Sequence, residues 1–156
     1  ETFDHVNCQG VIHHTPDINA AISEIARVLK PGGTASISVY HRNIVLRSWT
    51  YLRWIGWLLA KAGGGLKGRG REKIFLQKDV DEIVRLYDGV ENPLGTSFTR
   101  GEFVKMLEEH FVVQETYLHF FPARALPFRL PSGLHRWLDK RFGFMIYASL
   151  QKPCVD

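Results

Sequence analysis

Cysteine is scarce: the chain of 156 residues contains two, Cys8 and Cys154, and neither belongs to a CxxC pair. Two cysteines are too few for the disulfide framework of a small secreted domain, and their spacing does not match a structural zinc site. Cys8 lies in the middle of a β-prone run and is expected to be buried rather than nucleophilic. We therefore expect a protein of a reducing, cytoplasmic compartment.

Long apolar runs are also lacking. The most apolar segment, 44–61, is interrupted by Arg47 and Arg53 and is shorter than the roughly 20 residues that cross a bilayer. No apolar targeting segment comes before the β-prone residues 3–6, and the first residue is Glu1 rather than Met, which predicts a part of a longer protein. The composition, 45% hydrophobic and 23% charged, is that of one globular domain with enough residues for a core.

Nucleophile patterns are missing as well. No Ser–His–Asp or Cys–His arrangement stands out, so the sequence nominates no covalent catalyst. The net charge of +4 is spread unevenly, with a basic stretch at 61–78 and an acidic one at 79–123. Such blocks are typical of solvated faces and linkers, and we expect no nucleic-acid partner.

What the sequence does contain is a regular order of strands and helices. Residues 3–9 predict a strand, and Asp17 predicts the cap of a helix at 18–29. The turn residues 30–33 end this helix and lead into a strand at 34–40. Such a βαβ unit has parallel strands, so the predicted fold class is α/β. The later elements are predicted as helices at 44–61, 79–87, 99–110 and 132–141 and as strands at 111–121 and 144–150.

The segment 44–95 is predicted to be a helical insertion or lid. Its first part, 44–61, indicates a helix with a wide apolar face, and a basic glycine-rich loop follows at 63–73. One interpretation is that this face packs on the core or covers a site. The other is peripheral membrane contact through 44–73, which three tryptophans and the basic loop favour.

The glycine-rich loop contains a motif that matches a nucleotide-binding pattern. Gly63, Gly65 and Gly68 satisfy G-x-G-x-x-G, the dinucleotide fingerprint. That fingerprint works where a strand delivers the glycines to a helix N-terminus, whereas these follow a predicted helix. We therefore interpret them as part of a linker.

Two strand ends carry the polar residues of a candidate site. Ligands of open α/β sheets bind beyond the carboxyl ends of the strands, where the chain places residues 9–14 and 40–43. The residues expected to line one concave site are Gln9, Gly10, His13, His14, Tyr40 and His41. The alternative is that His14 caps the next helix and the other residues pack.

The same region offers three metal-ligating side chains, Cys8, His13 and His14. Adjacent histidines in an extended turn are expected to point apart, and no fourth ligand follows at a helical or CxxC spacing. We therefore predict no metal site.

Three segments resemble one family. Residues 3–6 (FDHV), 10–17 (GVIHHTPD) and 24–33 (EIARVLKPGG) are similar to the second half of class I S-adenosylmethionine-dependent methyltransferases. The closest group includes quinone and other small-molecule methylases. The most specific part is 27–33, and 99–116 still resembles that family's capped helix and the strand after it.

This resemblance implies a partial Rossmann-like methyltransferase sheet, made of the family's fourth to seventh strands with the last one antiparallel. Residues 1–156 would form a single α/β domain, the C-terminal part of a longer methyltransferase domain. The family's glycine-rich cofactor loop and the acidic residues that hold the ribose and adenine belong to strands before Glu1. The 156 residues alone are therefore expected to be inactive.

The resemblance also implies roles for single residues. Gln9, with Gly10 beside it, matches the position next to the methionine part of S-adenosylmethionine. His13 and His14 match paired histidines near the acceptor pocket, where an imidazole orients a substrate or removes its proton. The implied activity is methyl transfer to a small-molecule acceptor, a reaction in which positioning and desolvation supply most of the acceleration.

A second hypothesis comes from a different class. Without the preceding strands, the strand at 3–9 would be an unpaired sheet edge, and such edges are normally covered or paired. The chain would then be a non-catalytic α/β module that forms a homo-oligomer or pairs with a partner through this edge.

Overall fold

The computed structural model describes residues 1–156 except 67, 69–70, 72 and 155–156. The strands are β1 (Phe3–Gln9), β2 (Leu29–His41), β3 (Ser97–Phe98), β4 (Val112–His119) and β5 (Met145–Gln151). The helices are α1 (Ile18–Val28), α2 (Ile44–Arg47), α3 (Trp49–Lys61), α4 (Val80–Asp88), α5 (Arg100–Glu108) and α6 (Ser132–Phe142). Single 3-10 turns occur at Ile12–His14, Ile74–Leu76 and Ala123–Ala125.

The sheet has the order β1-β2-β5-β4, and the short β3 pairs with the end of β2. β1 and β2 are parallel, whereas β5 is antiparallel to β2 on one side and to β4 on the other. The predicted α/β class, the parallel βαβ unit and an antiparallel last strand inside the sheet are therefore confirmed. β5 lies between β2 and β4, and its Ile146, Ala148 and Leu150 are apolar because they pack in the core cluster on one face of the sheet.

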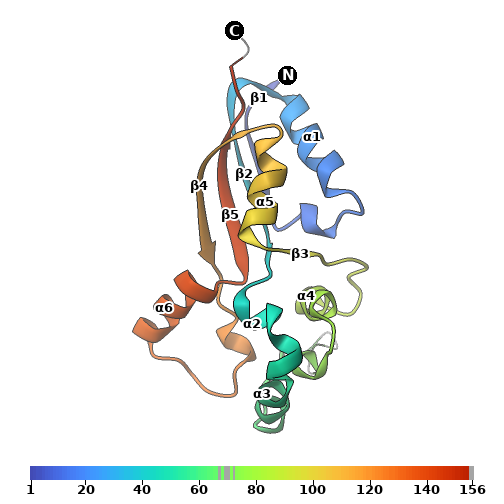
Figure 1. Cartoon of the computed structure of the whole chain (residues 1–156), viewed down its shortest axis with the longest axis vertical. Helices are drawn as coiled ribbons and strands as arrows, with labels where there is room; N and C mark the ends of the chain where they lie inside the picture. The colour runs from blue at the N-terminus through green and yellow to red at the C-terminus, as the bar shows by residue number, and fades with distance from the viewer. Residues whose placement is uncertain (67, 69–70, 72, 155–156) are drawn as a thin grey trace.

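Helices α1 and α5 cover one face of the sheet (Figure 1). Ile22 of α1 and Phe103 of α5 are fully buried and pack in one cluster with Ile37 of β2 and Ile146 of β5. The opposite face bears small polar residues, among them the paired Ser36 and Ser149, and the stacked rings of Tyr117 and Tyr147, whose centroids are 5.1 Å apart. The two faces of this sheet therefore differ in chemistry.

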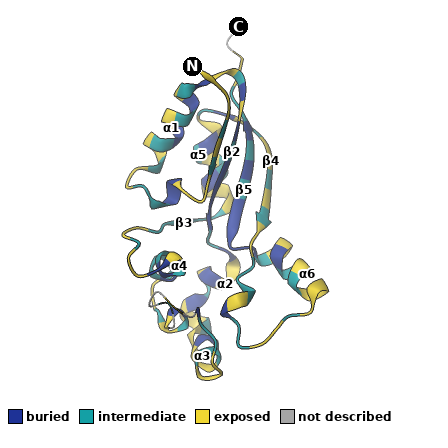
Figure 2. Ribbon diagram, turned by 180° about the vertical axis from the view of Figure 1, so that it is seen from behind, coloured by how far each residue is buried: buried dark blue, intermediate teal, exposed yellow. Residues whose placement is uncertain are grey.

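A second apolar cluster lies beyond the lower end of the sheet, where α2, α3 and α4 gather (Figures 1 and 2). Its buried members include Leu46, Trp49 and Val84. Among the described residues, no helix is both long enough and apolar enough to span a membrane.

The first helix begins as the sequence predicts. Asp17 is its N-cap, and the carboxylate Oδ1 accepts a hydrogen bond of 2.9 Å from the amide of Ala20. The strand that follows starts earlier than predicted, at Leu29 rather than Thr34. Leu29 pairs with Phe3 of β1, and the turn residues 30–33 form an irregularity before Thr34 pairs with His5, which a single-strand pattern does not reveal.

The helix predicted at 44–61 is two helices, α2 and α3, which meet at Ser48. Asn43 caps the first of them by accepting a hydrogen bond from the amide of Leu46. The predicted glycine-rich loop at 63–73 includes positions 67, 69–70 and 72, which lie outside the described residues. β3 was not predicted because two residues carry no periodicity.

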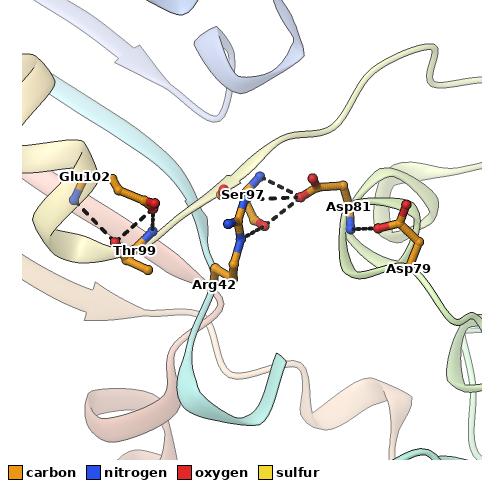
Figure 3. A network of polar contacts seen from close by, with 6 residues as sticks. All are labelled: Arg42, Asp79, Asp81, Ser97, Thr99 and Glu102. Atoms are coloured by element: carbon orange, nitrogen blue, oxygen red, sulfur yellow. Dashed lines mark hydrogen bonds and ion pairs between the residues drawn. The ribbon is translucent and has the colours of Figure 1, made fainter. Parts of the chain in front are cut away.

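A polar network joins the sheet to the helical end of the molecule (Figure 3). Arg42, just after β2, donates from Nη2 to the backbone carbonyl of Ser97 at 2.6 Å. The Ser97 hydroxyl donates to Asp81 of α4 at 2.8 Å. Thr99, two residues after Ser97, forms the predicted capping box of α5 with Glu102. The network fixes α4 beside the carboxyl end of β2.

Candidate functional site

The predicted site residues lie around the carboxyl ends of β1 and β2. Gln9 ends β1 and is exposed, and Gly10 follows with a left-handed φ of 72° that favours glycine. The Gly10 amide donates to the Ser38 hydroxyl of β2 at 3.0 Å. This turn directs the chain across the end of the sheet into the 3-10 turn Ile12–His14.

His13 is fully buried at the centre of the site. Its ring centroid lies 4.1 Å from that of His14 and 4.2 Å from that of Tyr40. Neither ring nitrogen has a hydrogen-bond partner among the described residues. Burial, followed by the neighbouring charge of His14, lowers the pKa of His13 to about 4, so the ring is neutral at pH 7.

His14 reaches two acceptor oxygens. Its Nδ1 lies 2.6 Å from the carbonyl oxygen of Leu94, with the Asn92 side-chain nitrogen 3.1 Å away. Its Nε2 lies 3.0 Å from Oδ2 of Asp88, the last residue of α4. The expectation that the adjacent histidines point apart is wrong, because the tight 3-10 turn places the two rings in contact. The alternative that His14 caps the next helix is also wrong, because Asp17 does so.

Tyr40 completes the cluster. Its hydroxyl donates a hydrogen bond of 2.5 Å to the same Oδ2 atom of Asp88. Burial and then the bond to Asp88 raise the pKa of Tyr40, so the phenol keeps its proton and remains a donor. Asp88 is the member of this cluster that sequence reasoning did not place in the site. Its signal in the sequence was its position near the end of a predicted helix.

His41 does not join this cluster. Successive side chains of a strand point to opposite faces, and Nδ1 of His41 lies 2.9 Å from the carbonyl oxygen of Gly143. Burial lowers the pKa of His41. The structure therefore brings together His13, His14 and Tyr40 of the predicted pocket, with Asp88 added, and gives His41 a separate contact with the loop before β5.

An apolar cavity of about 200 Å³ lies next to the cluster, between the helices at the lower end of the sheet. Tyr87 and Phe144 line it, and their ring centroids are 6.4 and 5.0 Å from that of Tyr40. The other walls come from α2, α3 and the 3-10 turns. Aromatic rings thus separate an apolar space from a group of imidazole, phenol and carboxylate.

Known proteins resemble the first part of the chain most clearly. Residues 1–37 match a family model described as a methyltransferase domain. The ubiquinone biosynthesis O-methyltransferase of Aliivibrio fischeri is 41% identical over 44 residues, which are 28% of this chain and 19% of that protein. The corresponding enzyme of Idiomarina loihiensis is 40% identical over 48 residues, again 19% of its length. The chain therefore aligns with about a fifth of each of these relatives.

Two solved structures share the fold over nearly the whole chain. An S-adenosylmethionine-dependent methyltransferase of Methanosarcina mazei superposes with a TM-score of 0.54 at 18% identity, covering 99% of this chain and 61% of that one. The 1,6-didemethyltoxoflavin-N1-methyltransferase of Burkholderia thailandensis was solved with bound 1,6-didemethyltoxoflavin and S-adenosylhomocysteine. It superposes with a TM-score of 0.51 at 17% identity, covering 97% of this chain and 44% of that one. Residues 1–37 thus match a methyltransferase domain, and the chain has the α/β, Rossmann-like fold of S-adenosylmethionine-dependent methyltransferases.

Proposed function

We propose that this chain is the C-terminal part of a methyltransferase that transfers the methyl group of S-adenosylmethionine to a small-molecule acceptor. One observation carries the proposal. The segment that matches a methyltransferase domain, residues 1–37, contains Gln9, Gly10, His13 and His14, which surround the open end of β1. In α/β sheets of this kind, ligands bind at that end of the strands.

The cofactor proposed is S-adenosylmethionine, which supplies an electrophilic methyl group on a sulfonium sulfur. The exposed Gln9 and the open space around Gly10 fit the methionine part of such a molecule, since no atom lies within 4 Å of the Cβ position at Gly10. The Burkholderia neighbour, with S-adenosylhomocysteine bound, supports the same cofactor. The remaining contacts would come from a segment that precedes Glu1.

The uncovered face of the sheet supports the proposal that the chain is part of a longer protein. Rossmann-like sheets carry helices on both faces, whereas α1 and α5 both pack on one face here. The other face of β2 and β5 presents serines and tyrosines. The chain also covers 61% of the Methanosarcina structure, so the activity proposed is that of the longer protein.

The acceptor proposed is a small apolar molecule with a nucleophilic hydroxyl. The cavity of about 200 Å³ is lined almost entirely by carbon, which suits one apolar end of such a molecule. His13 and His14, next to the aromatic wall of this cavity, would hold the hydroxyl in line with the methyl group. The C–O bond forms as the C–S bond breaks, S-adenosylhomocysteine leaves, and the hydroxyl proton passes to an imidazole of the histidine pair. The relatives named as O-methyltransferases support oxygen as the attacking atom.

The proposal is tested by expressing the chain with the residues encoded before Glu1. Transfer of labelled methyl from S-adenosylmethionine to a panel of hydroxylated aromatic compounds is then measured. Gln9→Ala is expected to raise KM for the cofactor roughly five- to tenfold, the value of one hydrogen bond. Gln114→Ala, which changes an exposed glutamine of β4, is the matched control and should change nothing. Failure of the longer protein to methylate any acceptor or to bind cofactor would contradict the proposal.

The free edge of β1 favours a second candidate function. Among the described residues β1 pairs with β2 alone, and five of its seven residues are exposed. An open edge of this kind is a template for pairing with another chain. A non-catalytic, self-associating module would remain oligomeric at micromolar concentration even with the preceding residues present. A monomer under these conditions, measured by light scattering, would exclude it.

A further inference from the structure

We propose that His13, His14 and Asp88 form a binding site for a divalent transition-metal ion such as zinc. Each of the three side chains offers one donor atom, and these atoms all lie within 4.8 Å of one another. Two imidazoles and one carboxylate are a donor set that suits zinc, iron and cobalt, whereas magnesium prefers oxygen donors. The three residues come from two distant parts of the chain, the turn after β1 and the end of α4.

The buried ring of His13 lacks a well-formed hydrogen bond. Its side chain is 1% exposed, and among the described residues neither Nδ1 nor Nε2 has a partner of normal hydrogen-bond geometry, although the backbone of Ser38 is near enough to affect the pKa of the ring. Leaving a buried polar group unsatisfied costs about 1–3 kcal/mol, so such groups are rare without a function. A neutral imidazole has one nitrogen lone pair, which is what a metal ion needs.

His14 has contacts at both ring nitrogens. Nδ1 lies 2.6 Å from the carbonyl oxygen of Leu94, and Nε2 lies 3.0 Å from Oδ2 of Asp88. A backbone carbonyl on the far nitrogen is the usual support of a metal-bound histidine, so Nε2 is the nitrogen that would face the ion. The distance of 3.0 Å between Nε2 and the carboxylate oxygen is close to the roughly 3.4 Å that separates two donors on a tetrahedral zinc ion.

The Asp88 carboxylate is held by a further contact. Tyr40 donates to Oδ2 of Asp88, which orients the group and leaves Oδ1 available. Two donors on a tetrahedral zinc ion are about 3.4 Å apart, because each Zn–N or Zn–O bond is about 2.1 Å long. The donor atoms, which lie within 4.8 Å of one another, therefore need to close by up to about 1.4 Å, and the half-exposed Asp88 side chain has room to move.

The role of the ion rests on the proposed function. Three protein ligands leave a coordination position open, and an acceptor hydroxyl bound there would lose its proton more easily, as water does on zinc. The site would thus turn the acceptor into the stronger oxyanion nucleophile before methyl transfer. The binding of the ion itself is independent of cofactor and acceptor, so it can be measured alone.

The test is metal binding by the purified, tag-free protein after chelator treatment. Calorimetry with Zn²⁺ should show one site per chain, Co²⁺ should give a visible absorption band of a tetrahedral or five-coordinate ion, and Mg²⁺ should show no binding. Asp88→Asn, which keeps the side-chain shape and can still accept from Tyr40, is expected to weaken zinc binding at least tenfold, as is His14→Asn. His135→Asn, a change in α6, is the matched control and should bind as the parent chain does.

Folding of each variant is checked by circular dichroism, and Zn²⁺ should raise the Tm of the parent chain but not that of Asp88→Asn. Absence of zinc binding by the parent chain overturns the site. Zinc binding by Asp88→Asn and His14→Asn that is as tight as that of the parent chain also overturns it, because the ion would then bind elsewhere, for example at Cys154. Binding without methyl transfer by the longer protein would overturn the proposed function alone. Methyl transfer that survives chelation, with no zinc bound, would overturn the metal site alone.

Discussion

His13 carries a polar ring into the interior, and neither of its nitrogens has a partner of normal hydrogen-bond geometry in the described part of the chain. Residues that serve a site are often retained although they reduce stability. His13→Phe replaces the imidazole by an apolar ring of similar shape. We expect it to raise the free energy of unfolding by about 1 kcal/mol, because it removes an unsatisfied polar group. Urea unfolding measures the change, and an equal or lower stability would mean that His13 has a partner in the folded protein.

Gly143 lies where two elements approach closely. A Cβ added there would meet the backbone nitrogen of His119 at 2.6 Å and the carbonyl oxygen of Asp139 at 2.7 Å. Gly143→Ala is expected to lower the free energy of unfolding by about 1–3 kcal/mol, the usual cost of overpacking. Gly101→Ala in α5 is the control, since its Cβ meets nothing within 4 Å and helix propensity favours alanine. Equal unfolding midpoints for the two variants would contradict this account.

Single residues of the site were partly predictable. His13, His14 and Tyr40 follow strand ends in the sequence, so the general position of ligand sites in α/β sheets was enough to group them. Asp88 was not predictable, because its distance from Tyr40 along the chain is 48 residues and depends on how α4 packs. Local patterns carry no information on such a contact.

Helix α3 exposes several large aromatic side chains on its surface. Tyr51 is 82% exposed and Trp54 is 62% exposed, and Arg53 and Lys61 add positive charge to the same helix. Peripheral contact with an anionic membrane through 44–73 remains a prediction. An exposed aromatic and basic helix suits the interface between lipid headgroups and acyl chains.

Trp54→Ser together with Trp57→Ser is therefore expected to reduce sedimentation with phosphatidylglycerol vesicles several-fold, and added salt should reduce it further. Trp137→Ser, the same change at an exposed site of α6, is the control and should leave sedimentation unchanged. Equal loss in the double variant and the control, or no binding by the parent chain, would contradict a docking role for α3.

Most helices and strands were predicted correctly from the spacing of apolar residues and from helix caps. The differences between the predicted and the observed elements have physical causes. The alternation and spacing of apolar residues predicted β1, α1, α5 and β5, and Thr99 with Glu102 marked a helix start. The break at Ser48 between α2 and α3 was missed, because the sequence there stays helix-prone. The early start of β2 depends on pairing with β1 across a bulge, which is a tertiary effect.

At the scale of the whole molecule, the arrangement is a one-sided sheet with an open edge. α1 and α5 cover one face, β1 leaves its outer edge without a described partner, and the candidate site lies at the end of β1 and β2. We propose that this chain supplies the acceptor side of a methyltransferase site and that a preceding segment of a longer protein supplies most of the cofactor contacts.

Binding of S-adenosylmethionine, measured by calorimetry on two proteins, tests this claim most directly. The 156-residue chain is expected to give no measurable heat, because Gln9 and Gly10 contact only one end of the cofactor. The longer protein, which adds the residues encoded before Glu1, is expected to bind one equivalent. Tight binding by the 156 residues alone, or no binding by the longer protein, would contradict the account.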